Sequence, residues 1–312
     1  MSLPARSNSD VKPIIFIHTS DKQMLAAKVC AYSLRTRSKF REEFEIKILR
    51  LEETPYLSTG REGRRYLWDK RVCIWHKRDL QSFAPLRMMV PEVMGFHGRA
   101  LVLDPDIFAI GDVYELLQRD MKGKAILCLR RPSGFYTSAV MLLDCARLKH
   151  WQWKQNLDAS FAFRLDMYHW LCLTGENPDT IGPLEDEWNH LDTLNETTRL
   201  LHNTERLTQP WKTGLPVDFD LDEVGAYPYR AGFHSSDILK RIKQRLASSR
   251  ISPMGRYQPH PDSKQENFFV ALLKEAIDQG AVREQFVADE IQRKHVRADL
   301  FELLGKVPLK TA

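Results

Sequence analysis

The stretch that decides the fold runs from Arg99 to Val113 and reads RALVLDPDIFAIGDV. Ala100 to Leu103 form an unbroken apolar run, which is typical of a strand buried on both faces of a mostly parallel sheet. Asp104 and Asp106 follow directly, with Pro105 between them. An Asp-x-Asp pair therefore stands at the carboxyl edge of the predicted sheet, where open α/β sheets bind their ligands.

The charge of this pair needs a partner. Two carboxylates held close together repel each other, and a buried unpaired charge is costly. A divalent cation removes both costs and leaves coordination positions for phosphate oxygens. Asp-x-Asp also occurs by chance, and Asp104-Pro105 could simply open a turn. Because the pair directly follows a buried-strand pattern, we predict a metal site here.

The bulk properties narrow the class of protein. A chain of 312 residues suits one large α/β domain with an appendage. The net charge of +5 fits a phosphate-bearing ligand but is too small to indicate nucleic acid. The five cysteines are scattered and form no Cys-x-x-Cys motif, which predicts buried free thiols and a reducing compartment. Without a signal-peptide pattern or a membrane-length apolar run, we expect a cytoplasmic protein.

The first strand is predicted over Ile14 to Ile17, and it ends in the polar turn His18-Thr19-Ser20-Asp21. In the next segment Leu25, Val29 and Tyr32 share one helical stripe. A helix N-terminus at a sheet edge favours anions, so the turn could contact a nucleotide, although the chain lacks the Gly-x-Gly-x-x-Gly motif of dinucleotide sites. Further strands are expected over 44–51, 125–129 and 135–143, and helices over 82–94 and from 113.

A basic and aromatic segment spans residues 54–78. Its lysines and arginines are interleaved with Tyr66, Trp68 and Trp75. A solvated face is the simpler interpretation. The alternative is a surface for an anionic acceptor or for peripheral contact with a membrane.

The composition changes near residue 220. We divide the chain there into a main domain, 1–220, and a C-terminal helical extension, 221–312, that packs on it. Within the extension the pattern predicts a basic amphipathic helix over 238–246 and a Pro- and Gly-rich connector over 252–263. A capping box from Ser263 to Glu266 then opens a helix that stops at Gly280.

Several motifs stand in order between residues 14 and 214. After the first strand come Arg-Met-Met-Val-Pro-Glu from Arg87, Leu-Asp-Pro-Asp-Ile from Leu103, Thr-Ser-Ala-Val-Met-Leu-Leu from Thr137, Trp188-Asn189, and His202 before Pro210-Trp211. Together they resemble the family 8 glycosyltransferases, the glycogenin and galactosyltransferase-like group. The resemblance implies an α/β fold of GT-A type, a mostly parallel sheet flanked by helices with a C-terminal helical appendage. Residues 1–220 would be the catalytic domain that binds a nucleotide sugar.

The resemblance also implies a reaction and a set of ligands. The reaction is a retaining transfer of a sugar from a nucleotide donor, usually a UDP-sugar, with Mn²⁺ or alternatively Mg²⁺, to a glycan, lipid or protein acceptor. Asp104, Asp106 and His202 would hold the metal, and an imidazole beside two carboxylates favours Mn²⁺. The donor would contact Thr19, Ser20, Asp21, Arg87, Asp104, Pro105, Asp106, Thr137, Ser138 and Lys212, with Arg206 as an alternative cation for the phosphates.

Retention requires either a carboxylate nucleophile or attack on the same face guided by the leaving group. Two-step glycosidases use a carboxylate pair. Asp166 and Asp192 are the acids that we would assign to this role. Each also has a structural interpretation, as a helix cap or as a structural acid.

The sequence departs from the family pattern in three places. Thr137-Ser138-Ala139 stands where the family often has Asn-Ser-Gly, Gln209 where it usually has lysine, and Arg130-Arg131 where some members have an acid. A catalytically impaired protein that binds nucleotide sugars is therefore an alternative. A metal-dependent phosphatase also uses Asp-x-Asp after a strand, but this order of motifs fits it less well. A nucleotidyltransferase would release diphosphate instead of UDP.

Overall fold

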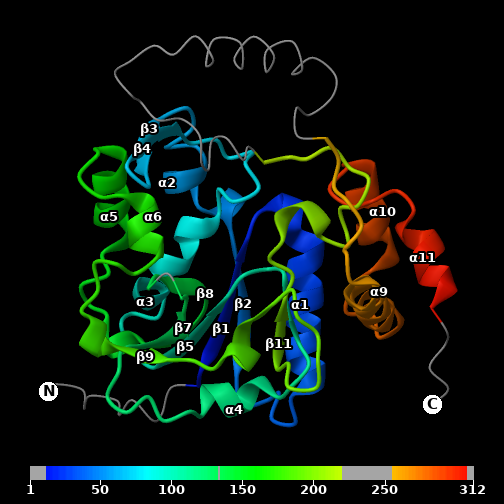
Figure 1. The fold of residues 1–312 in the computed structure, drawn as a ribbon, viewed down its shortest axis with the longest axis horizontal. Coiled ribbons are helices and arrows are strands. Elements are labelled where there is room, and N and C mark those ends of the chain that lie inside the picture. The colour runs from blue at the N-terminus through cyan, green and yellow to red at the C-terminus, as the bar shows by residue number, and fades with distance from the viewer. Residues whose placement is uncertain (1–11, 133, 220–254, 308–312) are drawn as a thin grey trace, which may run out of the picture.

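The computed structural model describes residues 12–132, 134–219 and 255–307. A six-stranded sheet lies at its centre, in the order β2-β1-β5-β8-β7-β9 (Figure 1). β2, β1 and β5 run parallel, as do β7 and β9, whereas β8 is antiparallel to both of its neighbours. The expected α/β class, with a mostly parallel sheet flanked by helices, is confirmed. The strand bounds are β1 Ile14–Thr19, β2 Glu45–Arg50, β5 Arg99–Leu103, β7 Ile126–Arg130, β8 Tyr136–Asp144 and β9 Ile181–Pro183.

Both faces of this sheet are covered, which explains why its strands read as continuous apolar runs. Ile15 and Ile17 of β1 face one core, whereas Phe16 faces the other. In Figure 1, α1 lies on one side of the strands, and α3, α5 and α6 lie on the opposite side. The carboxyl ends of the strands are thus held by a sheet buried on both faces. These helices are α1 Met24–Arg37, α3 Val90–Val93, α5 Trp153–Phe161 and α6 Met167–Leu171.

The helix expected over residues 82–94 is not continuous. The structure has a 3₁₀ helix, Ala84–Met89, followed by α3, and each has a proline in its first turn, Pro85 and Pro91. Proline lacks the N–H that an unbroken helix needs and clashes with the preceding turn. Arg87 lies in the 3₁₀ part and is only 9% exposed, so it is a buried arginine and not a surface one.

A second, three-stranded sheet brings a distant segment to the Asp-x-Asp pair. β6 (Ile107–Ala109) pairs antiparallel with β11 (Leu200–His202), which pairs parallel with β10 (His190–Leu191). His202 is opposite Ile107 in this register. Because Ile107 directly follows Asp106, the pairing places the imidazole beside that carboxylate. After β6, Asp112 caps α4 (Val113–Leu117).

The basic segment 54–78 folds into α2 (Pro55–Ser58) and an antiparallel hairpin of β3 (Arg65–Trp68) and β4 (Arg71–Ile74). Tyr66 and Trp68 pack against the second core, while Arg64 and Arg65 are exposed. The segment therefore has a solvated basic face and an aromatic inner face.

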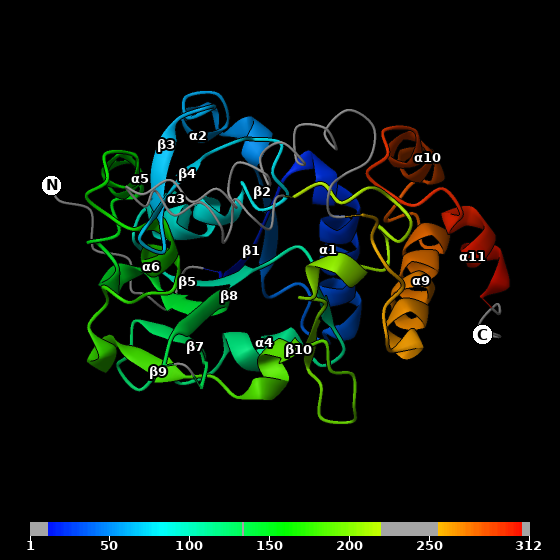
Figure 2. The same ribbon diagram turned by 45° about the horizontal axis from the view of Figure 1, so that its top comes forward.

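The C-terminal helices lie beside α1, on its side away from the sheet, in both views (Figures 1 and 2). They are α9 (Ser263–Asp278), α10 (Glu284–Gln292) and α11 (Leu300–Lys306). The ring of Phe269 in α9 lies 4.9 Å from the ring of Trp211 and 5.4 Å from that of Phe108. The cap of α9 is Asp262, one residue before the expected Ser263. The helix expected over 238–246 lies outside the described residues, and the domain boundary at residue 220 stays a prediction.

Two smaller expectations concern thiols and membranes. All five cysteines are free, and four of them are buried. Among the described residues, no helix has both the length and the apolar character that crossing a bilayer requires.

We expect Val287→Ala in α10 to lower the free energy of unfolding by about 2 kcal/mol, because Val287 is fully buried and the change removes two carbon atoms. Val287 belongs to the same core as Ile15 of the central sheet. Chemical denaturation should therefore show one transition that moves as a whole. The matched control is Val93→Ala, at a position 43% exposed. A separate, early transition in Val287→Ala would instead indicate a C-terminal part that unfolds on its own.

Candidate functional site

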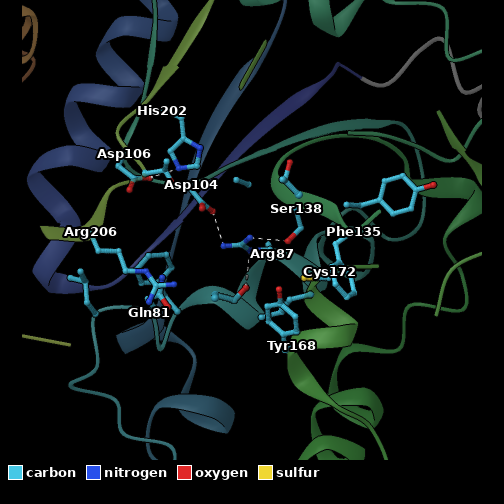
Figure 3. A pocket seen from close by; sticks show the side chains of 18 of the residues that line it. Gln81, Arg87, Asp104, Asp106, Phe135, Ser138, Tyr168, Cys172, His202 and Arg206 are labelled. Carbon is cyan, nitrogen blue, oxygen red and sulfur yellow. Dashed lines mark hydrogen bonds and ion pairs between the residues drawn. The ribbon is translucent and has the colours of Figure 1, made fainter. Parts of the chain in front are cut away.

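Asp104, Asp106 and His202 come together at the ends of β5 and β11 (Figure 3). One ligand atom from each lies within 4.8 Å of the others. Nε2 of His202 is 3.4 Å from Oδ1 of Asp106, and both side chains are largely buried. These are the three residues that were predicted to share a metal ion.

The imidazole of His202 is oriented by a hydrogen bond on its other nitrogen. Nδ1 lies 2.8 Å from Oδ1 of Asn189, and Nδ2 of Asn189 donates to Oγ1 of Thr137. Because the amide oxygen of Asn189 can only accept, Nδ1 carries the proton, which leaves the lone pair of the neutral ring on Nε2. A hydrogen bond of this kind on the outer nitrogen is the usual support of a metal-binding histidine.

The two oxygens of Asp106 have different surroundings. Oδ2 accepts a hydrogen bond from Nε2 of Gln209 at 3.1 Å. Oδ1 is buried without a hydrogen-bond partner and faces His202. A buried carboxylate oxygen without a donor is costly, and a cation would satisfy it. The donor set of two carboxylates and one imidazole therefore fits Mn²⁺, and Mg²⁺ less well.

Gln209 is held by a relay of hydrogen bonds that starts at an indole. Nε1 of Trp211 donates to Oε1 of Gln23 at 2.8 Å, and Nε2 of Gln23 donates to Oε1 of Gln209 at 2.9 Å. An indole N–H can only donate, so the direction of every amide in the relay is fixed. Gln209 must then present its NH₂ group to Asp106. Sequence reasoning noted Gln209 only as a departure and missed Gln23.

One oxygen of Asp104, Oδ1, contacts two nitrogen-bearing side chains. Oδ1 lies 2.8 Å from the guanidinium of Arg87 and 2.7 Å from Nε2 of His18. Burial opposes ionisation, but Arg87, His18 and His202 together outweigh it and hold the pKa of Asp104 far below its usual range. Burial and the nearby Arg87 lower the pKa of His18, so this imidazole is neutral at pH 7. His18 was not among the predicted site residues.

The affinity for Mn²⁺ should fall as the pH is lowered from about 8 to about 6, because a proton on Nε2 of His202 competes with the metal. Burial opposes the charged ring, but Asp106 and Asp104 outweigh it and raise the pKa of His202 above 6.5, which moves the competition towards neutral pH. The fall should approach about tenfold per pH unit for one displaced proton. Calorimetric titrations with Mn²⁺ at several pH values measure it. His202→Asn should bind more weakly and with a flatter dependence; an equally steep slope in that variant would contradict the assignment.

The three residues open into a cavity of about 210 Å³ with two chemically distinct ends. Asp106, His202, Arg206 and Gln81 lie at one end, and Phe135, Tyr168 and Cys172 at the other, as Figure 3 shows. Arg87 lies between the ends and bridges Asp104 to Oγ of Ser138, which is 2.8 Å away. We refer to the first as the metal end and to the second as the aromatic end.

Some of the residues predicted to contact the donor line the cavity, and others lie in the protein interior or point elsewhere. Thr137 and Ser138 line the cavity, together with Arg87. Thr19 and Ser20 are buried and do not line it, and Pro105 is buried between the two acids. Asp21 points elsewhere, to an ion pair of 2.6 Å with Arg50. From the same polar turn it is Gln23 that reaches the cavity.

The structure distinguishes the two candidate phosphate cations. Lys212 is fully buried, does not line the cavity, and pairs with Asp218 at 3.1 Å. Burial lowers its pKa, against the attraction of Asp218. Arg206 lines the metal end, and no carboxylate of the described chain forms an ion pair with it. Of the two candidates, only Arg206 therefore reaches the cavity, and its role as a phosphate cation stays a prediction.

Neither proposed nucleophile lines the cavity. Asp166 caps α6 with hydrogen bonds from Tyr168 and His169, and its carboxylate also accepts the backbone N–H groups of Asp69 and Lys70. Oδ2 of Asp192 accepts the N–H of Glu205, and its Oδ1 lies 3.5 Å from Nε2 of His260. Burial raises the pKa of Asp192, but the position of each acid argues for a structural role.

Comparisons with known proteins give weak likenesses. No family model and no curated protein matches the sequence. Among solved structures, the chain is similar to the glycosyltransferase GlyE of Streptococcus pneumoniae TIGR4, with 16% identity and a TM-score of 0.46 over 64% of this chain and 57% of that one. It is similar to mouse xyloside xylosyltransferase 1, with 14% identity and a TM-score of 0.42 over 62% and 98% of the two chains.

A third similar structure is the galactosyltransferase LgtC in complex with donor and acceptor sugar analogues, with 11% identity and a TM-score of 0.45 over 64% and 89% of the chains. The chain thus spans 57% of the length of GlyE. At these identities and TM-scores the similarity does not identify a reaction.

Proposed function

We propose that this protein is a metal-dependent retaining glycosyltransferase, which moves a hexose from a nucleotide donor, a UDP-sugar, to a glycan, lipid or protein acceptor. The observation that supports the proposal is the cluster of Asp104, Asp106 and His202. Two carboxylates and an oriented imidazole face one point at the strand ends, beside Arg206. That combination suits a diphosphate held through a divalent cation.

The reaction breaks the bond between the anomeric carbon and a phosphate oxygen, and the bonding electron pair stays on that oxygen. When bound at Asp104, Asp106 and His202, Mn²⁺ would offset the negative charge that develops on the diphosphate. Arg206 would add a second positive charge from the protein. The acceptor hydroxyl oxygen bonds to the same carbon, and its proton passes to the leaving phosphate oxygen.

Retention is better explained by attack on the same face than by a carboxylate nucleophile. Among the described residues that line the cavity, Asp104 and Asp106 are the only carboxylates, and both would be committed to the metal. Asp166 and Asp192 lie outside it. Ser138 and Arg87 instead present polar groups where the transferred sugar would lie.

Incubation with a panel of UDP-sugars and Mn²⁺ should release UDP from one of them by slow donor hydrolysis. Arg206→Gln should lower this rate by about tenfold to 100-fold, because one charged contact to the leaving group is lost. The control is Arg119→Gln, which breaks an exposed pair with Glu185, and neither of these residues lines the cavity. Equal rates in Arg206→Gln and the wild type would rule out Arg206 as the phosphate cation.

The catalytically impaired binder is the second candidate, and Gln209 favours it. This side chain hydrogen-bonds to Asp106 and brings no charge to the diphosphate. In the same assay, an impaired protein would bind UDP with Mn²⁺ and release none from any donor. Release of inorganic phosphate or of diphosphate would instead indicate a phosphatase or a nucleotidyltransferase.

A further inference from the structure

The aromatic end of the cavity is built from three rings that come from separate segments. Trp68 belongs to β3, Phe135 precedes β8, and Tyr168 lies in α6. The centroid of the Tyr168 ring is 5.5 Å from that of Trp68 and 5.9 Å from that of Phe135. All three line the cavity and are only half-buried. We call these three residues the aromatic wall.

The aromatic wall suits a pyranose ring. One face of a pyranose carries mainly C–H groups, and burying that face against aromatic carbon removes apolar surface from water. Open aromatic surface in a cavity, with a few polar groups around it, is the usual composition of a small-molecule site. Three half-covered rings in one place therefore indicate a ligand with an apolar face.

One cation, Arg131, lines the cavity at this end. Arg131 is exposed and lines the cavity, and no carboxylate of the described chain forms an ion pair with it. Arg131, Tyr168 and Cys172 line the same cavity. Burial raises the pKa of Tyr168 and of Cys172; the charge of Arg131 opposes the rise in both, whereas Asp69 adds to it at Tyr168 and Asp166 at Cys172, and neither acid lines the cavity. The two acids of the cavity lie at the metal end, beyond Arg87 (Figure 3). An anionic group at the aromatic end would meet a cation and no nearby acid of the lining.

The position of Arg87 assigns the two ends to different substrates, and this step rests on the proposed function. A diphosphate bound at the metal end directs its sugar towards Arg87 and Ser138, which lie at the middle of the cavity. The acceptor hydroxyl has to reach that sugar from the side that the donor leaves open. That side is the aromatic wall.

We propose that the aromatic wall and Arg131 form the acceptor subsite, and that the acceptor is a glycan whose sugar ring stacks on the wall and carries an anionic group, a carboxylate or a phosphate, towards Arg131. Stacking selects a sugar, and the arginine selects an acidic one. The aromatic rings supply most of the contact area, while Arg131 discriminates among sugars of the same shape.

The test measures binding of three small glycosides by saturation-transfer NMR, with and without saturating UDP and Mg²⁺, which is used because Mn²⁺ broadens NMR signals. The probes are methyl β-D-glucoside, methyl β-D-glucuronide and methyl β-D-glucoside 6-phosphate. We expect one or both anionic probes to bind about threefold to fivefold more tightly than the neutral one, which is the size of an exposed ion pair. Comparing the two anionic probes distinguishes a carboxylate from a phosphate.

Two variants separate charge from stacking. Arg131→Gln should remove the preference for the anionic probes and leave the neutral probe unchanged, and Arg119→Gln should alter neither. Trp68→Ala should weaken all three probes; Tyr168→Leu provides the same test if the first variant is unstable in a thermal melt. Equal binding of neutral and anionic probes, or an unchanged preference in Arg131→Gln, would overturn the proposal.

The remaining outcomes are also decisive. If UDP with Mg²⁺ displaces the glycosides, the aromatic wall holds the nucleobase and is no acceptor subsite. If UDP binds by calorimetry while no glycoside does, the acceptor inference fails and the proposed function stands. If UDP does not bind with either metal, the proposed function fails, while the measurements without UDP still decide whether the wall selects acidic sugars.

Discussion

Asp106→Ala should abolish metal-dependent binding of UDP. Asp106 contributes one of three ligand atoms that lie within 4.8 Å of each other, and its Oδ1 is buried without another partner. Loss of a group that merely supports a ligand costs about 10-fold to 100-fold in metal affinity, so loss of a ligand should exceed about 100-fold. Calorimetry with Mn²⁺, and with UDP in the presence of Mn²⁺, measures both effects.

Asp106→Asn separates a missing ligand from a damaged fold. Asparagine keeps the shape and can still accept the hydrogen bond from Gln209, but it lacks the charge. Without metal it should melt close to the wild type, and Mn²⁺ should raise its melting temperature far less. Asp144→Asn, at an acid that caps a short helix away from the cavity lining, is the matched control. Normal binding of metal and UDP by both Asp106 variants would show that the site has been assigned wrongly.

Arg87→Met should lower the free energy of unfolding by about 3–5 kcal/mol in metal-free protein. Arg87 and Asp104 form an ion pair of 2.8 Å whose side chains are 11% and 17% exposed. Removing one partner of a buried pair leaves the other charge uncompensated, and methionine keeps the volume so that the loss is mainly electrostatic. Denaturant titration gives the value. The control Arg119→Met breaks a pair at a more exposed site and should cost about 1 kcal/mol or less.

Two further measurements identify the cause of this loss. Saturating Mn²⁺ should stabilise Arg87→Met more than it stabilises the wild type, because the metal restores positive charge beside Asp104. The pKa of His18, lowered by burial and by the charge of Arg87, should rise in the variant and can be followed by NMR. A variant as stable as the wild type without metal would mean that Asp104 does not depend on Arg87.

The contact between His18 and Asp104 could have been derived from the sequence. The apolar runs from Ile14 and from Ala100 pair in register as parallel neighbours, with Ile17 opposite Leu103. His18 and Asp104 are the first polar residues after the two runs, so parallel pairing puts them side by side. The two buried strands alone, without this register, do not predict that the two side chains meet.

The sequence does not predict which side chains of the segment after β11 face the site. Only the resemblance between the ordered motifs predicts His202 as a metal ligand. β11 spans only Leu200–His202 and is too short to show a hydrophobic periodicity. From His202 to Trp211 the chain has only a three-residue 3₁₀ helix, Arg206–Thr208, so no repeat indicates which side chains face the cavity. Spacing alone could not separate Arg206 from Lys212; that depended on the ion pair of Lys212 with Asp218.

The one-way relay from Trp211 to Asp106 sets a rule for which side chains position 209 can accept. The amide of Gln209 accepts a hydrogen bond from Gln23 through Oε1 and donates one to Asp106 through Nε2. Glutamate would turn a second anion towards Asp106, and lysine would leave the NH₂ of Gln23 without an acceptor. Glutamine is therefore the complementary residue at this position, and a Gln209→Lys substitution would replace a neutral side chain that both accepts and donates with a charged one that can only donate.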